Sequence, residues 1–368
     1  MKIIKINLKK NPYNIYIGHG ILKNIPFYIK NWDLGNLGII LTSPIIYSLY
    51  KNSIKKNFPS GRYKIITVAD GEKAKSKEQL FYAINKILKL DGWDKRPFIL
   101  CLGGGTIGDL GGLVAALYKR GIPYIQIPTT LLAQIDASIG GKTAIDLKEA
   151  KNILGAFYQP KAVFIDPLFL DTLTLKELKE GMAEAIKYAM IEGKNFFTFL
   201  KKNSRGIMEL NPPLILKLIN TCCRIKAKIV ERDEREEKGL RTILNLGHTL
   251  AHALEASSKY KKISHGQAVS IGLLYAAGLS LALGKCDKKK VDAVREIIEA
   301  FGLPVDISFD YPKLLRAFKY DKKFISGKVR MVLIKDIGNL EITDGIPLKK
   351  IEGSLRLFNG KKCRSLAL

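Results

Sequence analysis

The order of short apolar runs along the chain constrains its fold most strongly. Runs rich in Ile and Val alternate with stretches of helical periodicity up to residue 167, and they occupy residues 37–42, 61–68, 97–102, 123–127 and 162–166. This alternation is typical of an α/β domain with a largely parallel, Rossmann-like sheet. The first twenty residues alternate between polar and apolar side chains, which predicts two paired strands before the first helix.

The pattern changes at Asp166-Pro167, where the proline disfavours helical backbone in the residue before it. Long helical patterns dominate from there, and no clear strand follows until residues 330–334. A chain of 368 residues is long enough for two domains. We therefore expect an α/β domain over residues 1–167 and an all-α domain over residues 168–368.

Composition argues against a membrane or secreted protein. No run of 18 or more apolar residues is present, and the first twenty residues contain no apolar segment of the signal-peptide type. The five cysteines form no C-x-x-C pair, which fits a reducing compartment. The sequence therefore predicts a cytoplasmic protein without a membrane partner.

The formal net charge of +27 admits a rival class, the nucleic-acid-binding proteins. Lysines cluster at residues 51–56, 285–290 and 348–362, but the clusters lack interleaved aromatic residues and match no zinc-finger, RRM or OB pattern. Solvated lysine faces are the favoured interpretation, so no nucleic-acid partner is expected. A basic cleft would also attract an anionic substrate.

Histidines are concentrated in one short segment. Three of the four histidines, His248, His252 and His265, lie between residues 241 and 269. Neutral imidazole is a common zinc ligand, and a catalytic zinc uses three protein ligands and keeps one position open. Glu184 is the best candidate for a carboxylate ligand, and Lys187 shares its face of a predicted helix. The alternative for this last pair is a surface ion pair.

The segment from Arg241 to Glu255 reads as one helix. Arg241, Asn245, His248 and His252 would share a face of that helix, since they are spaced by four, three and four residues. A solvated stripe is the alternative. The glutamate that follows the first histidine in zincins is replaced by Thr249, which argues against a metalloprotease.

A glycine-rich turn, CLGGGTIGDLGG, follows the apolar run at residues 97–102 and precedes a helical stretch expected over Asp109–Arg120. Its glycines satisfy G-x-G-x-x-G, which would let backbone approach a pyrophosphate at a helix start. The motif is weak alone, because the usual ribose-binding acid is not obvious downstream, and a turn without a ligand is the alternative. The polar turn at residues 70–75 is expected to line the same crevice.

A third motif spans residues 128–160 and supplies threonines, lysines and an asparagine near glycine turns. Gly-Gly-Lys-Thr is not a P-loop, because Asp136 stands where the first glycine would be needed. The lysines nevertheless suit phosphate or carboxylate groups.

Together, in this order, these motifs make the chain resemble the 3-dehydroquinate synthase family, the sugar-phosphate cyclases of the shikimate pathway. The resemblance runs through DGEKAKS, LGGGTIGDLGG, QIPTTLLAQIDASIGGKTAID, KNILGAFYQP, GMAEAIKY, LRTILNLGHTLAHALE, HGQAV and DKK. It covers nearly the whole chain, and eight motifs in the correct order are highly specific.

The resemblance implies roles for particular residues. It implies one divalent metal, zinc or cobalt, bound by Glu184, His248 and His265. It implies NAD contacts from Asp70, Gly71, Glu72, Lys73, Ala74, Lys75, Gly104, Gly105, Thr106, Ile107, Gly108, Asp109, Thr129, Thr130, Lys142, Lys151, Phe169, Leu170, Asp171 and Thr172. It places around the substrate Asp136, Lys142, Lys151, Asn152, Lys187, Lys226, Arg241, Asn245 and His252, with Lys322 or Lys323. It also implies a homodimer, in which Arg120 reaches the neighbouring subunit's site.

The activity implied is cyclisation of 3-deoxy-D-arabino-heptulosonate 7-phosphate to 3-dehydroquinate with release of phosphate. The steps are transient oxidation by NAD, phosphate elimination, re-reduction and an intramolecular aldol closure. Since metal ligands and glycine turns fall in different halves, we expect the site in the cleft between domains. Alternatives are another sugar-phosphate cyclase and a metal-dependent NAD polyol dehydrogenase.

The chain departs from the family pattern in two places that bear on these roles. Gln267 stands where the family usually has a glutamate after His-Gly, beside the predicted ligand His265. The loop at residues 233–240 is one residue longer than usual, which leaves Lys228 as an alternative to Lys226.

Overall fold

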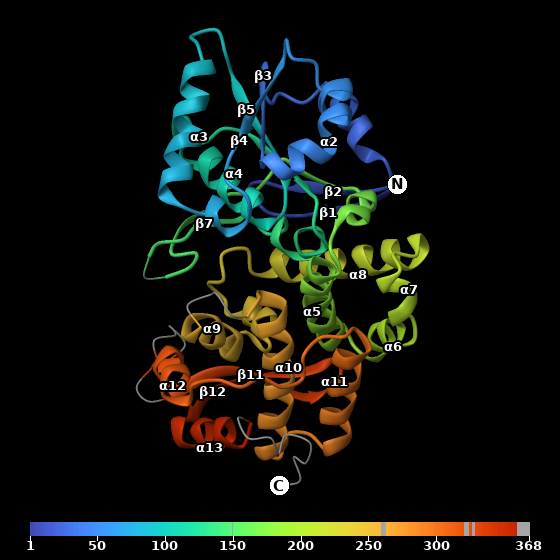
Figure 1. The fold of residues 1–368 in the computed structure, drawn as a ribbon, viewed down its shortest axis with the longest axis vertical. Coiled ribbons are helices and arrows are strands. Elements are labelled where there is room, and N and C mark those ends of the chain that lie inside the picture. Colours follow the sequence, from blue (N-terminus) through green and yellow to red (C-terminus); the bar gives the residue numbers. More distant parts are fainter. Residues whose placement is uncertain (149, 259–262, 320–323, 326–327, 359–368) are drawn as a thin grey trace. The chain divides into compact units, whose positions relative to one another are not determined.

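The computed structural model describes residues 1–148, 150–258, 263–319, 324–325 and 328–358 (Figure 1). These residues form two compact units. The sheet unit contains residues 1–174 and 215–235, and the helical unit contains residues 175–214 and 236–368. The domain limits 1–167 and 168–368 stay a prediction about folding domains. In the structure, residues 168–174 belong to the sheet unit. So does most of the long helix Pro212–Arg232, from Ile215 onward.

A seven-stranded sheet forms the centre of the sheet unit (Figure 1), in the order β1-β2-β9-β6-β5-β3-β4. The strands are β1 (Lys2–Ile6), β2 (Tyr13–Ile17), β3 (Leu37–Thr42), β4 (Tyr63–Thr67), β5 (Pro97–Gly103), β6 (Tyr124–Pro128) and β9 (Ala162–Ile165). Within this sheet β1 and β2 pair antiparallel, and all the other neighbouring strands pair parallel. The predicted mostly parallel sheet and its five Ile/Val-rich strands are confirmed.

Helices cover both faces of this sheet. Ile39 and Leu41 of β3 pack into a core with α3 (Lys77–Leu90) and α4 (Gly105–Leu117). Ile40, between them, packs on the opposite face with α1 (Ile25–Ile29) and α2 (Pro44–Asn57). Strand β3, which is buried along its whole length, therefore contributes side chains to two cores, as buried parallel strands do.

Short elements complete the sheet unit. The antiparallel pair β7 (Lys142–Ile145) and β8 (Leu154–Phe157) lies outside the main sheet. The single-turn elements are η1 (Ile21–Asn24), η2 (Gly71–Ala74), η3 (Tyr118–Arg120), the π-helical η4 (Ala133–Ala137) and η5 (Pro167–Thr172).

Helix α4 corrects the expected span of Asp109–Arg120. The helix begins at Gly105, inside the glycine motif, and ends at Leu117. A Cβ atom at Gly111 would lie 2.3 Å from Cys101 Sγ, so the glycines permit close packing of the helix on the sheet. The predicted start of the helix was too late because glycine has a low helix propensity. The close packing on the sheet outweighs that propensity. Lys119 and Arg120 have positive φ and turn the chain after the helix.

Helices dominate the helical unit, as predicted. They are α5 (Leu175–Glu192), α6 (Lys194–Lys202), α7 (Ser204–Met208), the start of α8 (Pro212–Arg232), η6 (Leu240–Asn245), α9 (His248–Ser257), α10 (His265–Ala282), α11 (Lys288–Ala300), α12 (Tyr311–Lys319) and α13 (Leu348–Phe358). From Ile215 onward, α8 belongs to the sheet unit.

The expectation of an all-α second domain needs one correction. The helical unit also contains a small antiparallel sheet of β10 (Phe324–Ile325), β11 (Lys328–Asp336) and β12 (Asn339–Pro347). Strands β11 and β12 form a hairpin whose turn includes Gly338 at φ +86°. The run at residues 330–334 was therefore one arm of a hairpin, and its partner is too polar to stand out as a strand.

No helix in the described part of the chain has both the length and the apolar character needed to cross a membrane.

Candidate active site

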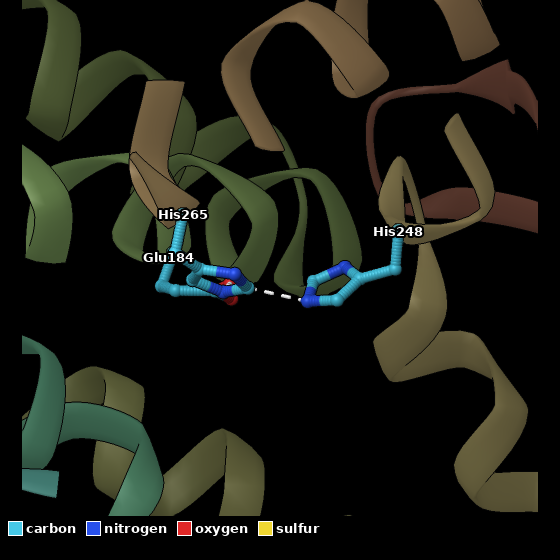
Figure 2. A group of neighbouring side chains, drawn as sticks. All are labelled: Glu184, His248 and His265. Atoms are coloured by element: carbon cyan, nitrogen blue, oxygen red, sulfur yellow. Dashed lines mark hydrogen bonds and ion pairs between the residues drawn. The ribbon is translucent and has the colours of Figure 1, made fainter. Parts of the chain in front are cut away.

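Three side chains of the helical unit meet at one point (Figure 2). Glu184 comes from the middle of α5, and His248 and His265 are the first residues of α9 and α10. Glu184 Oε1 lies 3.3 Å from His248 Nε2 and 3.2 Å from His265 Nε2. Each residue offers one ligand atom, and these atoms lie within 4.8 Å of one another. The structure thus brings together the three predicted metal ligands.

A backbone break places His248 at this point. The single helix expected over Arg241–Glu255 is wrong, because η6 ends at Asn245 and α9 starts at His248. Gly247 between them has φ +78°, and a Cβ atom there would lie 2.8 Å from Leu273 N. Only glycine suits this left-handed turn in close contact with α10. Arg241 and His248 therefore do not share one helix face.

In both imidazole rings, an oxygen lies near the nitrogen that faces away from Glu184. His248 Nδ1 lies 3.1 Å from the carbonyl oxygen of Leu246. His265 Nδ1 lies 3.6 Å from Glu255 Oε1. Metal-binding histidines usually donate their second N–H to a carbonyl or carboxylate in this way. Sequence reasoning missed Glu255, although its position seven residues after His248 puts both on one face of α9.

The electrostatics of the three residues match those of a cation site. Burial raises the pKa of the Glu184 carboxyl, but Lys187 and the histidines outweigh burial and hold that pKa well below its usual value. Burial lowers the pKa of His248. Burial also opposes the charged form of His265, but hydrogen bonding to Glu184 and Glu255 raises its pKa to about 10. A metal ion would take the place of that proton.

The donor set fits zinc or cobalt. Glu184 is fully buried, its Oε2 is paired with Lys187 Nζ, and its Oε1 faces the Nε2 atoms of both histidines. Two imidazoles and one carboxylate are a known catalytic zinc set. A cation at this point would face Glu184 Oε1, the carboxylate oxygen on which both histidines converge.

Of the other predicted substrate residues of the helical unit, Lys187 and His252 lie on α5 and α9, whereas Arg241 and Asn245 lie on η6. Lys187 is 2% exposed and is the ion-pair partner of Glu184, so this pair is buried and not on the surface. The rings of His252 and His248 have centroids 5.5 Å apart. Arg241 is 1% exposed, with Nε 3.5 Å from Glu236 Oε1, and Asn245 ends η6. Lys322 and Lys323 lie outside the described residues.

In the sheet unit, the glycine motif sits where β5 ends and α4 begins. Thr129 N, at the end of the neighbouring strand β6, donates to Gly103 O at 2.9 Å. A Cβ atom at Gly105 would lie 3.1 Å from Ala137 Cβ, so the backbone here has close neighbours. No side chain caps the start of α4, and Thr129 Oγ1 is buried without a hydrogen-bond partner in the described part of the chain. These groups fit a phosphate-bearing cofactor.

The polar turn at residues 70–75 lies beside this helix, as predicted. Lys75 Nζ donates to Asp109 Oδ2 at 2.7 Å and also to Asn152 Oδ1. Lys151 Nζ lies 2.9 Å from Glu72 Oε1. The structure therefore brings three separate segments together, namely the turn, the start of α4 and the loop before β8. Burial raises the pKa of Asp109 to about 6, although Lys75 opposes the rise.

Asp136 and Lys226 form a second charged pair in the sheet unit. Lys226 Nζ contacts the Asp136 carboxylate and donates to Asp136 O at 2.8 Å. Asp136 stands in the π-helical turn η4, a type of turn often found at functional sites. Lys226 is 7% exposed whereas Lys228 is exposed, which favours Lys226 for a role beside Asp136.

The remaining predicted residues of the sheet unit are spread over its loops. Thr130 Oγ1 accepts a hydrogen bond from Ala133 N at 3.2 Å. Lys142 is exposed at the start of β7, and Arg120 is exposed in the positive-φ turn. In η5, Phe169 and Leu170 are buried, whereas Asp171 and Thr172 are exposed.

The chain matches known proteins over almost its full length. Family models of the N-terminal and C-terminal parts of 3-dehydroquinate synthase match residues 65–180 and 181–324. The 3-dehydroquinate synthase of Dictyoglomus thermophilum is 41% identical over 361 residues, covering 98% of this chain and 99% of the relative.

Two solved structures share the fold over nearly the whole chain. A 2-deoxy-scyllo-inosose synthase complexed with carbaglucose-6-phosphate, NAD+ and Co2+ has a TM-score of 0.87 at 24% identity, covering 96% of this chain and 99% of that one. The 2-epi-5-epi-valiolone synthase of Streptomyces hygroscopicus, with NAD+ and Zn2+ bound, has a TM-score of 0.85 at 25% identity, covering 96% and 98%. With both parts of the family matched and its sequence aligned along almost its full length, the chain belongs to the 3-dehydroquinate synthase family.

Proposed function

We propose that the chain catalyses the cyclisation of 3-deoxy-D-arabino-heptulosonate 7-phosphate to 3-dehydroquinate with release of phosphate. Membership of the family supports this activity. The single observation that carries it is the convergence of Glu184, His248 and His265 in the helical unit. We also propose that this group and the glycine turn of the sheet unit serve the same substrate in one cleft.

NAD and one divalent metal, zinc or cobalt, would be the cofactors. Solved relatives bind NAD+ together with Co2+ or Zn2+. Glu184, His248 and His265 would hold the metal, and the backbone from Gly104 to Asp109 would face the pyrophosphate of NAD. Bound NAD supplies a reversible hydride acceptor for a secondary hydroxyl, and the metal supplies a Lewis acid that makes this hydroxyl more acidic.

The helical unit would bind the anionic substrate and move its protons. Arg241 is buried, and its guanidinium can hold a carboxylate or phosphate through two parallel hydrogen bonds. His252 carries an imidazole next to His248 and would exchange a proton with the substrate hydroxyl. Lys187 keeps a positive charge beside Glu184, and Asn245 would donate to a substrate oxygen.

In the sheet unit, side chains of the charged pairs would exchange their present partners for the ligands. Lys75 and Asn152 contact each other, and Lys151 contacts Glu72, so these side chains lie together. Lys142, Lys151 and Asn152 would bind substrate phosphate or carboxylate, and Lys226 would act with Asp136 beside them. Thr129 Oγ1 would donate to NAD, and Thr130 and residues 169–172 would complete its pocket.

Three further features remain part of the proposal. A homodimer would place Arg120 near the partner's site, and the exposed position of Arg120 supports this. A cytoplasmic location is supported by the free cysteines at positions 101, 222, 223 and 286. The absence of a nucleic-acid partner stays a prediction from the scattered lysines.

The test is a phosphate-release assay with the seven-carbon phosphate substrate. We expect phosphate release that needs NAD, stops after treatment with a strong chelator, and returns when zinc or cobalt is added. Absorbance from NADH should not accumulate. A polyol dehydrogenase would instead accumulate NADH in proportion to substrate consumed, and a different cyclase would release no phosphate from this substrate.

A further inference from the structure

Glu255 is a buried carboxylate close to the proposed metal site. It lies in the last turns of α9 and is 5% exposed. Its Oε1 lies 3.6 Å from Nδ1 of His265, the ring nitrogen that faces away from Glu184. Burying a carboxylate is costly unless a donor or a cation faces it. The position of Glu255 therefore needs a reason beyond packing.

The backbone that carries His265 is fixed by other contacts. Gly266 N donates to Glu180 Oε2 at 2.5 Å, and Ser264 N donates to Gln267 Oε1 at 3.1 Å. The second contact shows that Gln267, which replaces the usual glutamate of the family, closes the start of α10 and does not point its amide oxygen at the ring. The start of α10 is thus held without Glu255, and the freedom that remains is rotation of the His265 ring.

The Nδ1 atoms of the two histidines face different kinds of group. The ring of His248 is oriented by a backbone carbonyl, that of Leu246, so no side-chain substitution can remove this contact. At His265 the group that faces Nδ1 is a side chain, the Glu255 carboxylate, with Oε1 at 3.6 Å. A carboxylate at this nitrogen favours the tautomer with the proton on Nδ1, which leaves the Nε2 lone pair directed toward Glu184.

We propose that Glu255 is a positioning residue that orients His265 for metal binding. The proposal rests on the proposed function, because it presupposes a metal held by Glu184, His248 and His265. Glu255 does not touch the metal or the substrate. Its negative charge attracts the Nδ1 proton and makes the ring a better donor at Nε2, and with Glu184 it balances the charge of a divalent cation.

The chain offers a matched control for a merely structural role. Glu180 is a second carboxylate near His265, but it contacts the backbone of Gly266 and not a ring nitrogen. Glu255→Gln keeps the shape and an acceptor oxygen while it removes the charge. Glu255→Ala removes both, and Glu180→Gln removes a charge from the backbone contact alone.

The test measures metal binding by the metal-free protein, independently of turnover. Cobalt is titrated in competition with a chelator, and the visible absorption of bound cobalt reports the ligand geometry. We expect Glu255→Ala to weaken cobalt binding about 10–100-fold and to shift the absorption bands, with a smaller loss for Glu255→Gln. Glu180→Gln should keep the wild-type affinity and bands, and the thermal unfolding of the metal-free proteins verifies that each variant is folded.

The outcomes separate the two proposals. Wild-type affinity and bands in a folded Glu255→Ala protein would overturn the role of Glu255 and leave the metal site intact. If Glu255→Ala does not fold, Glu255→Gln decides, because unchanged affinity in that variant also overturns the role. An equal loss in Glu180→Gln would show general loosening of α10 and would overturn it as well. A wild-type protein that binds no cobalt would contradict the metal site of the proposed function itself.

Discussion

The two units organise their charged residues differently. In the sheet unit, the predicted binding side chains form separate pairs, with Lys75 on Asp109, Lys151 on Glu72 and Lys226 on Asp136. In the helical unit, both histidines converge on one oxygen of Glu184. Separate pairs can exchange partners when a ligand arrives, whereas a convergent group works only as a whole. Substitutions should therefore have graded effects in the sheet unit and all-or-none effects at the convergent group.

The largest effect is expected at the convergent group. His248→Ala should abolish most metal binding and lower turnover on the order of a thousandfold or more, since a Lewis acid contributes several kcal/mol. Metal content and phosphate release measure this. His19→Ala, at an exposed histidine of the sheet unit, is the control and should change neither. Full metal content and turnover in the His248→Ala protein would contradict the all-or-none effect expected at the convergent group.

A smaller effect is expected at Arg241. Arg241→Lys should lower kcat/KM by roughly 2–4 kcal/mol, because lysine cannot make two parallel hydrogen bonds to one anion. Metal and NAD binding should stay nearly unchanged. Arg205→Lys, at a highly exposed arginine that pairs with Glu209, is the matched control. A loss below threefold at Arg241 would indicate a structural arginine that does not meet the substrate.

Within the sheet unit, Gly105 should show the graded behaviour. Gly105→Leu adds atoms where Ala137 Cβ is already 3.1 Å from an added Cβ, and it narrows the approach to the start of α4. Crowding of this kind costs about 1–3 kcal/mol, and we expect NAD binding to weaken by a similar amount. NAD titration followed by protein fluorescence measures the change. Gly61→Leu, where an added Cβ meets no atom within 4 Å, should bind NAD normally.

The last effect, on stability and not on binding or turnover, is expected at Asp109. Its pKa is about 6 in the folded protein, above the value of 3.8 for an isolated aspartate. The folded state therefore holds this proton more tightly, so the contribution to stability is present at low pH and is lost as pH rises through 6. Between pH 4.5 and 7 the loss amounts to about 2 kcal/mol.

Substitution isolates this contribution. The difference in unfolding free energy between Asp109→Asn and wild type should move in favour of the variant by that amount as pH rises. Denaturant unfolding at both pH values measures it. A zero double difference at Asp109 would show that its carboxyl titrates normally.

Sequence patterns predicted the features that depend on short, contiguous motifs. The parallel strands follow from Ile/Val-rich runs, and the convergence of Glu184, His248 and His265 follows from the rarity of histidine together with the family motifs. The prediction of a continuous helix from residue 241 to 255 was wrong because Gly247 contacts α10, and no local sequence pattern specifies that neighbour. The hairpin partner β12 was missed because its side chains are mostly half-exposed and polar. Glu255 was missed because its partner, His265, lies on another helix.

The central claim is that one substrate is oxidised and then reduced again at the same carbon by a bound cofactor. The most direct test uses substrate with deuterium on the carbon whose hydroxyl is oxidised, with NAD present in less than stoichiometric amount. We predict complete phosphate release, full retention of deuterium in the carbocyclic product and no accumulated reduced cofactor. Deuterium that appears in accumulated reduced NAD, in proportion to the substrate consumed, would contradict the account.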